Sequence, residues 1–464
     1  MNDPEAGVKK HHEEKDPTPV ITPADGQVVD ASLRTQRGIK TRHAQMLAIG
    51  GTIGTGLFVG TGEALAIAGP APLLGVYVVI CILVYGIITA TSEMSTYLPV
   101  SGYSMAYYAN RLDIDNAVGG HCLYDPWSAG VICGTLLWWW PTHQRLGFYY
   151  WEYLGPAKEY LVPGAAGRLC GVVYVACFSV FSFNFAPELL VITAGEMHNP
   201  RKNLPKATKR YFYRLLIFYV LGVLAIGVIC NSNAPGLLSG EAGAAASPWV
   251  IAIKEAGIKG LDSVINAVII TSAWSSANSF LYMSSRSLYS RAVAGCSAWA
   301  VLASCVLGLL AYLNCGNEAS QVFNWLINLT NTAGFTSWVC CGITYTRFRM
   351  ACQAQAVTSL PYRLRFQPYL VWLAMCVFAM LLLCNGFSVF VVGNWSVSTF
   401  LTSYIGIPVF LGTYFAHRIY AHGDSWVQHP CSIDLHTGLA ELEADCPEEK
   451  TARIWWRQIQ AIWD

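Results

Sequence analysis

Six glycines between residues 50 and 62, inside the apolar segment 44–69, are the residues whose type and spacing most clearly indicate chemistry. A glycine inside a helix costs about 1 kcal/mol relative to alanine, so this density predicts a membrane helix that breaks partway. Main-chain N–H groups freed at membrane depth are tolerated only where they line a cavity or meet a ligand, which predicts a binding site. Close helix packing through small residues is the alternative interpretation. The glycines are Gly50, Gly51, Gly54, Gly56, Gly60 and Gly62.

Glu188 is the second residue of chemical interest, because it places a carboxylate inside an apolar segment. Insertion into lipid costs such a group roughly 2.5–3.5 kcal/mol, so it should face the bundle interior, be paired, or hold a proton. A functional Glu188 takes part in proton coupling or gate movement, whereas a structural one accepts hydrogen bonds from a neighbouring helix break. Glu93 and Glu196 lie near cytosolic ends of apolar segments, where a solvated or arginine-paired charge is expected.

The elements that carry these residues are those of a polytopic membrane protein. Of the 464 residues, 54% are hydrophobic and only 12% are charged, whereas about 25% charged is usual for soluble domains. Apolar cysteine-containing segments and the absence of a zinc spacing or disulfide framework predict no metal and no cofactor. About nine segments are candidate spans, most near the ~20 residues that a bilayer core requires. They cover residues 44–69, 73–98, 169–195, 215–231, 261–284, 297–313, 322–345, 369–393 and 396–416.

Basic residues predict the orientation through the positive-inside rule. Residues 1–42 are expected to form a disordered cytosolic tail, and the basic loop at 201–214 and the group at 347–365 are also expected in the cytosol. Residues 421–464 are predicted to form a second cytosolic tail, which ends in an amphipathic helix that lies on the inner leaflet or docks on a partner protein.

One region does not fit this topology. The span at 73–98 ends inside and the span at 169–195 must begin outside, so residues 99–168 must cross the membrane an odd number of times. Only residues 127–140, WSAGVICGTLLWWW, could supply a crossing, and they are short for one. The sequence therefore predicts an abnormal or truncated region here.

Several motifs are similar to those of fungal amino acid permeases of the amino acid, polyamine and organocation superfamily. They include RGIKTRHAQMLAIGGTIGTGLFVGTG, SGYSMAYYANR, ITAGEMHNPRKNLPKATKR, TSAWSSANSFLYMSSRSLYS, VFNWLINLT, LPYRLRFQPY and NWSVSTFLTSYIGIPVF. The resemblance covers most of residues 33–420 in the family's order and implies a membrane domain at 43–420.

The resemblance implies an all-α, LeuT-like bundle of inverted repeats, with the first and sixth helices broken at mid-membrane. This chain has about nine or ten spans instead of the family's twelve. Counterparts of most of helices three to five are missing, and the loop after Ser290 is shortened to RAVAGC.

The same resemblance implies a substrate site at the two breaks. Amides of Thr52, Ile53, Gly54, Thr55 and Gly56 would hold the substrate carboxylate. Carbonyls of the second break would accept hydrogen bonds from its ammonium group, and Pro187 favours a break there. Phe183 or Phe185 would either cap the side-chain pocket or belong to the core. The second break consists of Phe181, Ser182, Phe183, Asn184, Phe185 and Ala186.

Two further groups are candidates. Ser275, Ser276 and Asn278 resemble the family's eighth helix and could contact substrate or gate, although serine hydroxyls more often bond back to their own helix. Asn394 begins a glycosylation sequon, Asn-Trp-Ser, in a predicted external loop.

These observations favour uptake of an amino acid driven by protons through alternating access. The alternatives are an amino-acid-binding sensor that does not transport and a transport-incompetent truncated permease. No set of nucleophile, base and orienting residue indicates an enzyme. The expected partners are an amino acid, protons and the lipid bilayer, without nucleic acid, and the expected location is the plasma membrane with both termini in the cytosol.

Overall fold

The computed structural model describes the part of the chain that forms the helical bundle. The described residues are 56–98, 147–184, 186–197, 199–237, 247–258, 260–291, 297–310, 312, 319–357, 360–420, 428–436 and 439. The two predicted tails lie largely outside these ranges, as do residues 127–140 and the glycine-rich residues 44–55.

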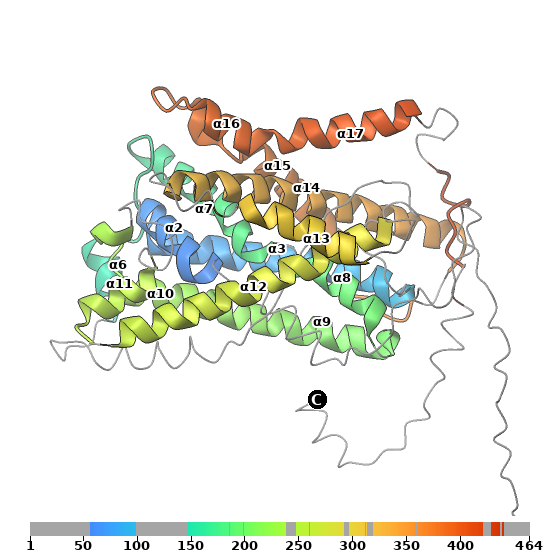
Figure 1. The fold of residues 1–464 in the computed structure, drawn as a ribbon, viewed down its shortest axis with the longest axis horizontal. Helices are drawn as coiled ribbons and strands as arrows, with labels where there is room; N and C mark the ends of the chain where they lie inside the picture. Colours follow the sequence, from blue (N-terminus) through green and yellow to red (C-terminus); the bar gives the residue numbers. More distant parts are fainter. Residues whose placement is uncertain are drawn as a thin grey trace, which may run out of the picture.

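The described residues form helices and no β-strand, which confirms the all-α prediction. In Figure 1 the long helices run side by side along the longest axis, with α3 (Pro70–Tyr97) among them. Each predicted span overlaps at least one helix. In the first half of the chain the elements are η2 (Gly56–Gly60), α2 (Thr61–Ala68), α3, α6 (Tyr149–Tyr153), α7 (Ala165–Phe183), α8 (Ala186–Glu196), α9 (Pro200–Leu216), η3 (Ile217–Leu221) and α10 (Gly222–Ile229).

The second half continues the bundle. A short turn and helix between spans, η4 (Pro235–Leu237) and α11 (Pro248–Glu255), precede the long helix α12 (Leu261–Arg291). The remaining elements are α13 (Ser297–Gly308), α14 (Ala319–Ala354), α15 (Tyr369–Cys384), η7 (Phe387–Phe390), α16 (Val397–Tyr404) and α17 (Gly406–Tyr420).

Length and hydropathy support a membrane-spanning bundle. Four described helical stretches are long and apolar enough to cross a bilayer: 70–97, 165–196, 200–229 and 261–288. A fifth span results if α16 and α17 count together, because they are bent by 44° at a short break. The other predicted spans form helices that are shorter or more polar than this criterion requires.

The basic segment at 201–214 differs from the prediction, since it is helical and not a loop. It forms α9, which begins with Pro200 at its first position and continues through η3 into α10. Proline at the first helical position lacks only an N–H that would have no partner there, so it favours a helix start. The basic residues therefore lie on a helical extension of a span.

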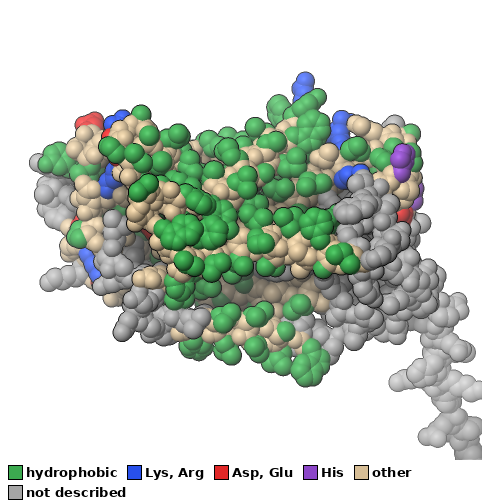
Figure 2. Space-filling model, turned by 90° about the horizontal axis from the view of Figure 1, so that it is seen from above, with side chains coloured by type: hydrophobic (Ala, Val, Ile, Leu, Met, Phe, Trp, Pro, Cys, Tyr) green, Lys and Arg blue, Asp and Glu red, His purple; other side chains and the backbone are tan. Residues whose placement is uncertain are grey.

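The surface of the bundle suits lipid. Hydrophobic side chains dominate the middle of the face in Figure 2. Large apolar side chains are exposed on α12 and α15, with Trp274 74% exposed and Leu383 68% exposed. Apolar exposure of this extent marks a surface that contacts lipid or protein.

α3 is the centre of the packing. It lies against α7, α8, α9, α14 and α15. Most of its side chains are buried, including polar residues near its C-terminal end such as Glu93 and Thr96. This helix therefore connects the two breaks described below to the rest of the bundle.

Candidate functional site

The break between α7 and α8 is where the sequence predicts the second interruption. Helix α7 ends at Phe183, and α8 begins at Ala186. At Asn184 the backbone has φ −55° and ψ 137°, which leaves the helical region. Pro187 lies in the first turn of α8, where its missing N–H removes no intrahelical bond. The prediction of a helix break within residues 181–186 is therefore confirmed.

Hydrogen bonds to three other helical elements hold this break. The Tyr219 hydroxyl donates to the Ser182 carbonyl, and the Tyr77 and Ser182 hydroxyls lie 3.0 Å apart. The Asn184 amide donates to the Thr330 carbonyl at 3.3 Å. A main chain that leaves its own hydrogen-bond ladder is thus positioned by groups of α3, η3 and α14.

Phe183 belongs to the core and does not cap a pocket. Its side chain is fully buried. Its ring centroid lies 4.4 Å from that of Tyr219 and 5.6 Å from that of Tyr77. The structure thus selects the core alternative for Phe183, whereas Phe185 lies outside the described residues.

The first break contributes Gly56 to the same place. Residues 52–55 lie outside the described part, and Gly56 opens the π-helical turn η2 that leads into α2. A Cβ added to Gly56 would lie 2.7 Å from the Ser182 Cα atom and 2.9 Å from its Oγ atom. Only glycine permits this approach of two main chains, so the ends of both predicted breaks meet.

Glu188 lies one turn beyond the second break, among neutral partners. Its side chain is buried, and the Ser337 hydroxyl donates to Oε1. Its other oxygen, Oε2, is buried without a hydrogen-bond partner among the described residues. Within the described residues no lysine or arginine forms an ion pair with it. The carboxylate therefore faces the bundle interior, as its cost in lipid predicts.

Glu93 and Glu196 are paired with arginines, as expected, but they are buried and not solvated. Glu196 Oε1 lies 2.8 Å from Arg286 Nη2, and Glu93 Oε2 lies 3.6 Å from Arg349 Nη1. The side chain of Glu196 is 7% exposed and that of Glu93 is 0% exposed. Each links two helices at the end of the bundle that the basic residues assign to the cytosol.

The candidates on α12 are divided between interior and surface. Ser275 and Ser276 are buried, whereas Asn278 is exposed. The helix lies against α8, α11 and α13. The structure therefore places α12 against α8. It does not place Asn278 in the interior of the bundle.

Asn394 is exposed in the connection between η7 and α16. Its main-chain N–H donates to the Val391 carbonyl at 3.0 Å. Ser396, the third residue of the sequon, caps α16 by accepting a hydrogen bond from the Thr399 N–H at 3.4 Å. The predicted acceptor is thus sterically accessible.

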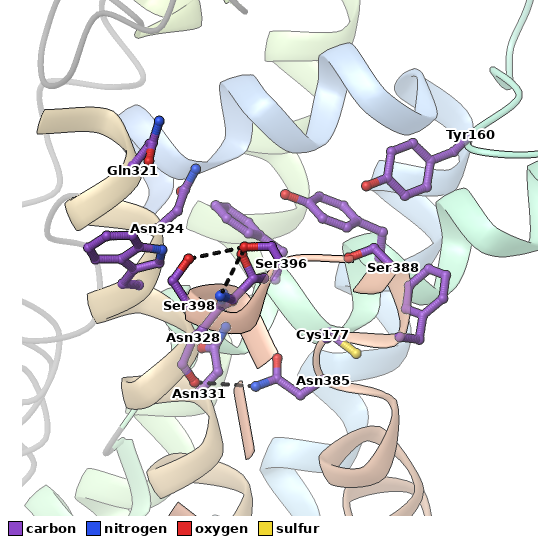
Figure 3. A pocket seen from close by; sticks show the side chains of 16 residues that line it. Tyr160, Cys177, Gln321, Asn324, Asn328, Asn331, Asn385, Ser388, Ser396 and Ser398 are labelled. Carbon is purple, nitrogen blue, oxygen red and sulfur yellow. Dashed lines mark hydrogen bonds between the residues drawn. The ribbon is translucent and has the colours of Figure 1, made fainter. Parts of the chain in front are cut away.

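A polar cavity that sequence reasoning missed lies between α7, α14 and the connection from α15 to α16. Its volume is about 450 Å³. Figure 3 shows carboxamide side chains from α14 along one wall and serines from the η7–α16 connection along another. A signal was present, because carboxamides recur on α14 at spacings of three, four and three residues, which place them on one helix face. They are Gln321, Asn324, Asn328 and Asn331.

A helical bundle with apolar spans and an interrupted helix is typical of secondary transporters. The profile of the amino acid permease family matches residues 43–137 and 131–424. The chain is 37% identical to the proline-specific permease of Emericella nidulans, over 92% of this chain and 94% of the relative. It is 37% identical to a probable proline-specific permease of Schizosaccharomyces pombe, over 88% and 90%. It is 32% identical to the proline-specific permease of Saccharomyces cerevisiae, over 91% and 81%.

The chain belongs to the amino acid permease family and is a membrane amino acid transporter. Its alignment with the Emericella nidulans permease has 518 positions, more than the 464 residues of this chain, so the relative carries residues without a counterpart here. The two profile matches meet at residues 131–137, inside the region where the topology predicts missing helices.

Proposed function

We propose that this chain takes up a small amino acid, with proline as the first candidate, by proton-coupled alternating access across the plasma membrane. The family membership and the relatives named as proline-specific permeases support the proposal. The termini would lie in the cytosol, in agreement with the basic residues of α9 and the end of α14.

The contact of Gly56 with Ser182 is the observation that carries the proposal. It brings the start of η2 against the end of α7, where the helical hydrogen bonding stops. A zwitterion fits such a place, because N–H groups at a helix start favour a carboxylate and free carbonyls favour an ammonium group. The proposed contacts are the amides of Thr52, Ile53, Gly54, Thr55 and Gly56 for the carboxylate, and the carbonyls of residues 181–186 for the ammonium.

Glu188 is the proposed proton carrier. It is buried beside the second break and has neutral hydrogen-bond partners, so the protein supplies no fixed cation to hold its charge. Protonation would remove the cost of a buried carboxylate when the site changes its exposure between the two sides. Ser275 and Ser276, on the helix that packs against α8, are the proposed gate contacts.

Uptake of radiolabelled proline into cells that lack their own amino acid permeases tests the proposal. Uptake should exceed that of empty cells, be inhibited by excess unlabelled proline but not by lysine or glutamate, and be abolished by a protonophore. Saturable proline binding without uptake would replace transport with sensing. Neither binding nor uptake, with the protein present at the cell surface, would identify a transport-incompetent chain.

The Gly56→Ala substitution should lower proline uptake at least tenfold. The added Cβ meets main chain that cannot move aside, and overpacking of this kind costs about 1–3 kcal/mol. Gly75→Ala is the matched control, since a Cβ there meets no atom within 4 Å. Equal uptake by both variants, at equal surface amounts, would show that the contact does not form in the working transporter.

The Glu188→Gln substitution should abolish accumulation driven by a pH gradient and preserve exchange of labelled for unlabelled proline. Glutamine keeps the shape and an acceptor for Ser337 but cannot release a proton. Both rates are measurable in proteoliposomes. Full accumulation by this variant would assign the coupling proton to another group.

A further inference from the structure

The cavity between α7, α14 and the η7–α16 connection differs from the proposed substrate site in its lining. Among the described residues, none of those proposed to bind substrate contributes to it. Its lining comes instead from the middle of α7, one face of α14, and the segments around η7 and the start of α16. This arrangement makes it a separate compartment of the protein (Figure 3).

Unpartnered acceptors belong to two of the residues that line this compartment. Asn331 is 1% exposed, and its Oδ1 atom is buried without a hydrogen-bond partner in the described structure. The Oδ1 atom of Asn324, two turns away on the same helix face, is also buried without a partner there. A buried acceptor without a partner costs about 1–3 kcal/mol, so the two amides indicate a ligand that donates hydrogen bonds.

The lining also restricts the charge of such a ligand. The described lining residues carry carboxamides, hydroxyls and aromatic rings, and none of them is an aspartate, glutamate, lysine or arginine. A zwitterion or an ion that entered the cavity would therefore lose its hydration and find no charged partner, and this desolvation costs free energy. A neutral molecule with many hydroxyl or amide groups can replace its hydrogen bonds to water by bonds to the lining, because each carboxamide offers both donors and an acceptor.

Aromatic residues complete the chemistry. Tyr174, Phe178 and Trp325 line the cavity beside the carboxamides. Rings of this kind bury large apolar area against a flat partner, and the C–H faces of a pyranose supply such a surface. The combination of carboxamides, hydroxyls and rings suits a sugar better than an aliphatic polyol.

The predicted glycosylation acceptor lies next to this cavity. Asn394 is exposed, and Ser396, two residues further along, lines the cavity (Figure 3). Two residues of extended chain span at most about 7 Å. A glycan on Asn394 would be present at high effective concentration at the cavity, because the linkage makes its binding intramolecular.

We propose that this cavity is a carbohydrate-binding site that takes an N-acetylglucosamine unit, either from the chain's own Asn394 glycan or from a free sugar. The Asn331 and Asn324 oxygens accept from sugar hydroxyl or N-acetyl groups, and Trp325 and Tyr174 cover its apolar face. Neither the transport cycle nor the proposed substrate site requires this occupancy.

The test compares melting temperatures of the full-length chain in lipid nanodiscs, with and without N,N′-diacetylchitobiose as the probe. The chain is produced in eukaryotic cells, and mass spectrometry reports whether Asn394 carries a glycan. The Asn394→Gln variant lacks the acceptor. In that variant the probe should raise the melting temperature in a saturable manner.

The two sources of the sugar give different results. If the wild-type chain is glycosylated and the probe shifts only the Asn394→Gln variant, the glycan of the chain itself occupies the cavity. If the probe shifts both forms equally, the site takes free sugar. Either result supports the carbohydrate site.

Substitutions in the lining locate the site. Asn331→Leu and Asn324→Leu, each made in the Asn394→Gln background, should weaken the probe about tenfold, because each removes a buried hydrogen-bond partner. Ser398→Ala is a milder variant should a leucine prevent folding. Gln353→Leu is the matched control, since Gln353 is an exposed carboxamide on the same helix, and it should leave the affinity unchanged.

Two outcomes would overturn the proposal. One is the absence of any saturable shift in the Asn394→Gln variant at probe concentrations up to the solubility limit. The other is an unchanged affinity in the folded Asn331→Leu, Asn324→Leu and Ser398→Ala variants, because the probe would then bind elsewhere.

Discussion

The two ends of the bundle are held together by different chemistry. At the end that the basic residues predict to be cytosolic, charged pairs join helices that are far apart in sequence: Glu93 of α3 meets Arg349 of α14, and Glu196 of α8 meets Arg286 of α12. At the opposite end, side chains donate to main-chain carbonyls. Lys158 reaches the carbonyls of Ala66 and Ser232 at 3.0 and 2.6 Å.

Two further bonds near Lys158 use carbonyl acceptors. Ser247 donates to the Phe58 carbonyl at 2.6 Å and Trp151 donates to the Gly227 carbonyl at 2.9 Å, whereas the Tyr174 hydroxyl donates to the Glu63 carboxylate at 2.8 Å. Carbonyl acceptors belong to the fold of the backbone and cannot be neutralised, whereas a carboxylate can be protonated or separated from its arginine. The pairs of Glu93 and Glu196 are therefore contacts that a change of charge can open.

The cytosolic charges are also not equivalent. Glu93 receives a hydrogen bond from the Tyr345 hydroxyl at 2.5 Å and another from the Leu364 N–H at 2.8 Å, in addition to Arg349. Arg349 is 11% exposed in its side chain, whereas Arg286 is 28% exposed. The α3–α14 pair is thus the better shielded of the two, and its loss should have the larger effect.

Glu93→Ala tests the charged end directly. It leaves Arg349 buried without its carboxylate and removes the acceptor of Tyr345 and Leu364. The free energy of unfolding should fall by about 3–5 kcal/mol, the usual cost of an orphaned buried charge. Titration with a denaturing detergent, followed by circular dichroism, measures it.

Tyr345→Phe is the control for this substitution. It removes one hydrogen bond and keeps the ion pair, so a loss of only about 1 kcal/mol is expected. Equal losses in the two variants would mean that the Glu93 carboxylate adds little to the free energy of unfolding beyond its hydrogen bond from the Tyr345 hydroxyl. The contrast between the two ends would then have no energetic basis.

Glu196→Gln should have an intermediate effect. In the parent chain the Tyr282 hydroxyl donates to Glu196 Oε2 at 2.8 Å. Glutamine keeps an acceptor for this hydroxyl but loses the electrostatic attraction to the partly exposed Arg286. A loss of about 1 kcal/mol is expected, because solvent screens an arginine at this exposure.

The functional consequence of Glu196→Gln is measurable separately from stability. Weaker contact between α8 and α12 should make the cytosolic side more accessible, so a thiol reagent added from that side should label a cysteine placed at Ser279 faster than in the parent chain. An unchanged labelling rate would mean that this pair does not limit cytosolic opening.

The sequence predicted these regions unequally, for physical reasons. The break at residues 181–186 was predictable because Pro187 and the family motif act locally, and the apolar spans were predictable from hydropathy alone. The pairing of Glu93 with Arg349 was not, because it joins residues far apart in sequence and depends on how α3 and α14 pack. Phe183 shows the same limit, since only its stacking on Tyr219 distinguishes core from pocket.

The cavity shows what periodicity can and cannot predict. The carboxamides of α14 share a helix face by spacing alone, but the opposing wall comes from η7 and the start of α16. A polar face within a membrane helix can meet water, another helix or a ligand, and only packing separates these cases. The basic segment of α9 was misassigned for a related reason, because charge density indicates the side of the membrane and not whether the chain is helical.

Lys158→Met should have a small effect on stability, comparable with that of Glu196→Gln, and tests the end with carbonyl acceptors. It removes the hydrogen bonds to the carbonyls of Ala66, in α2, and Ser232, after α10, and about 0.5–1.5 kcal/mol should be lost. The pH dependence gives a second measurement, because burial lowers the pKa of the Lys158 ammonium below its ordinary value of 10.5. Between that lowered pKa and 10.5 the unfolded chain binds more protons than the folded chain, so the lysine makes stability rise with pH in this window and not below it. The difference in unfolding free energy between the parent chain and Lys158→Met should therefore grow in favour of the parent as the pH approaches 10.5. A difference that shrinks with rising pH would mean that the charged ammonium is favoured by its carbonyl partners, and that this end, too, depends on charge.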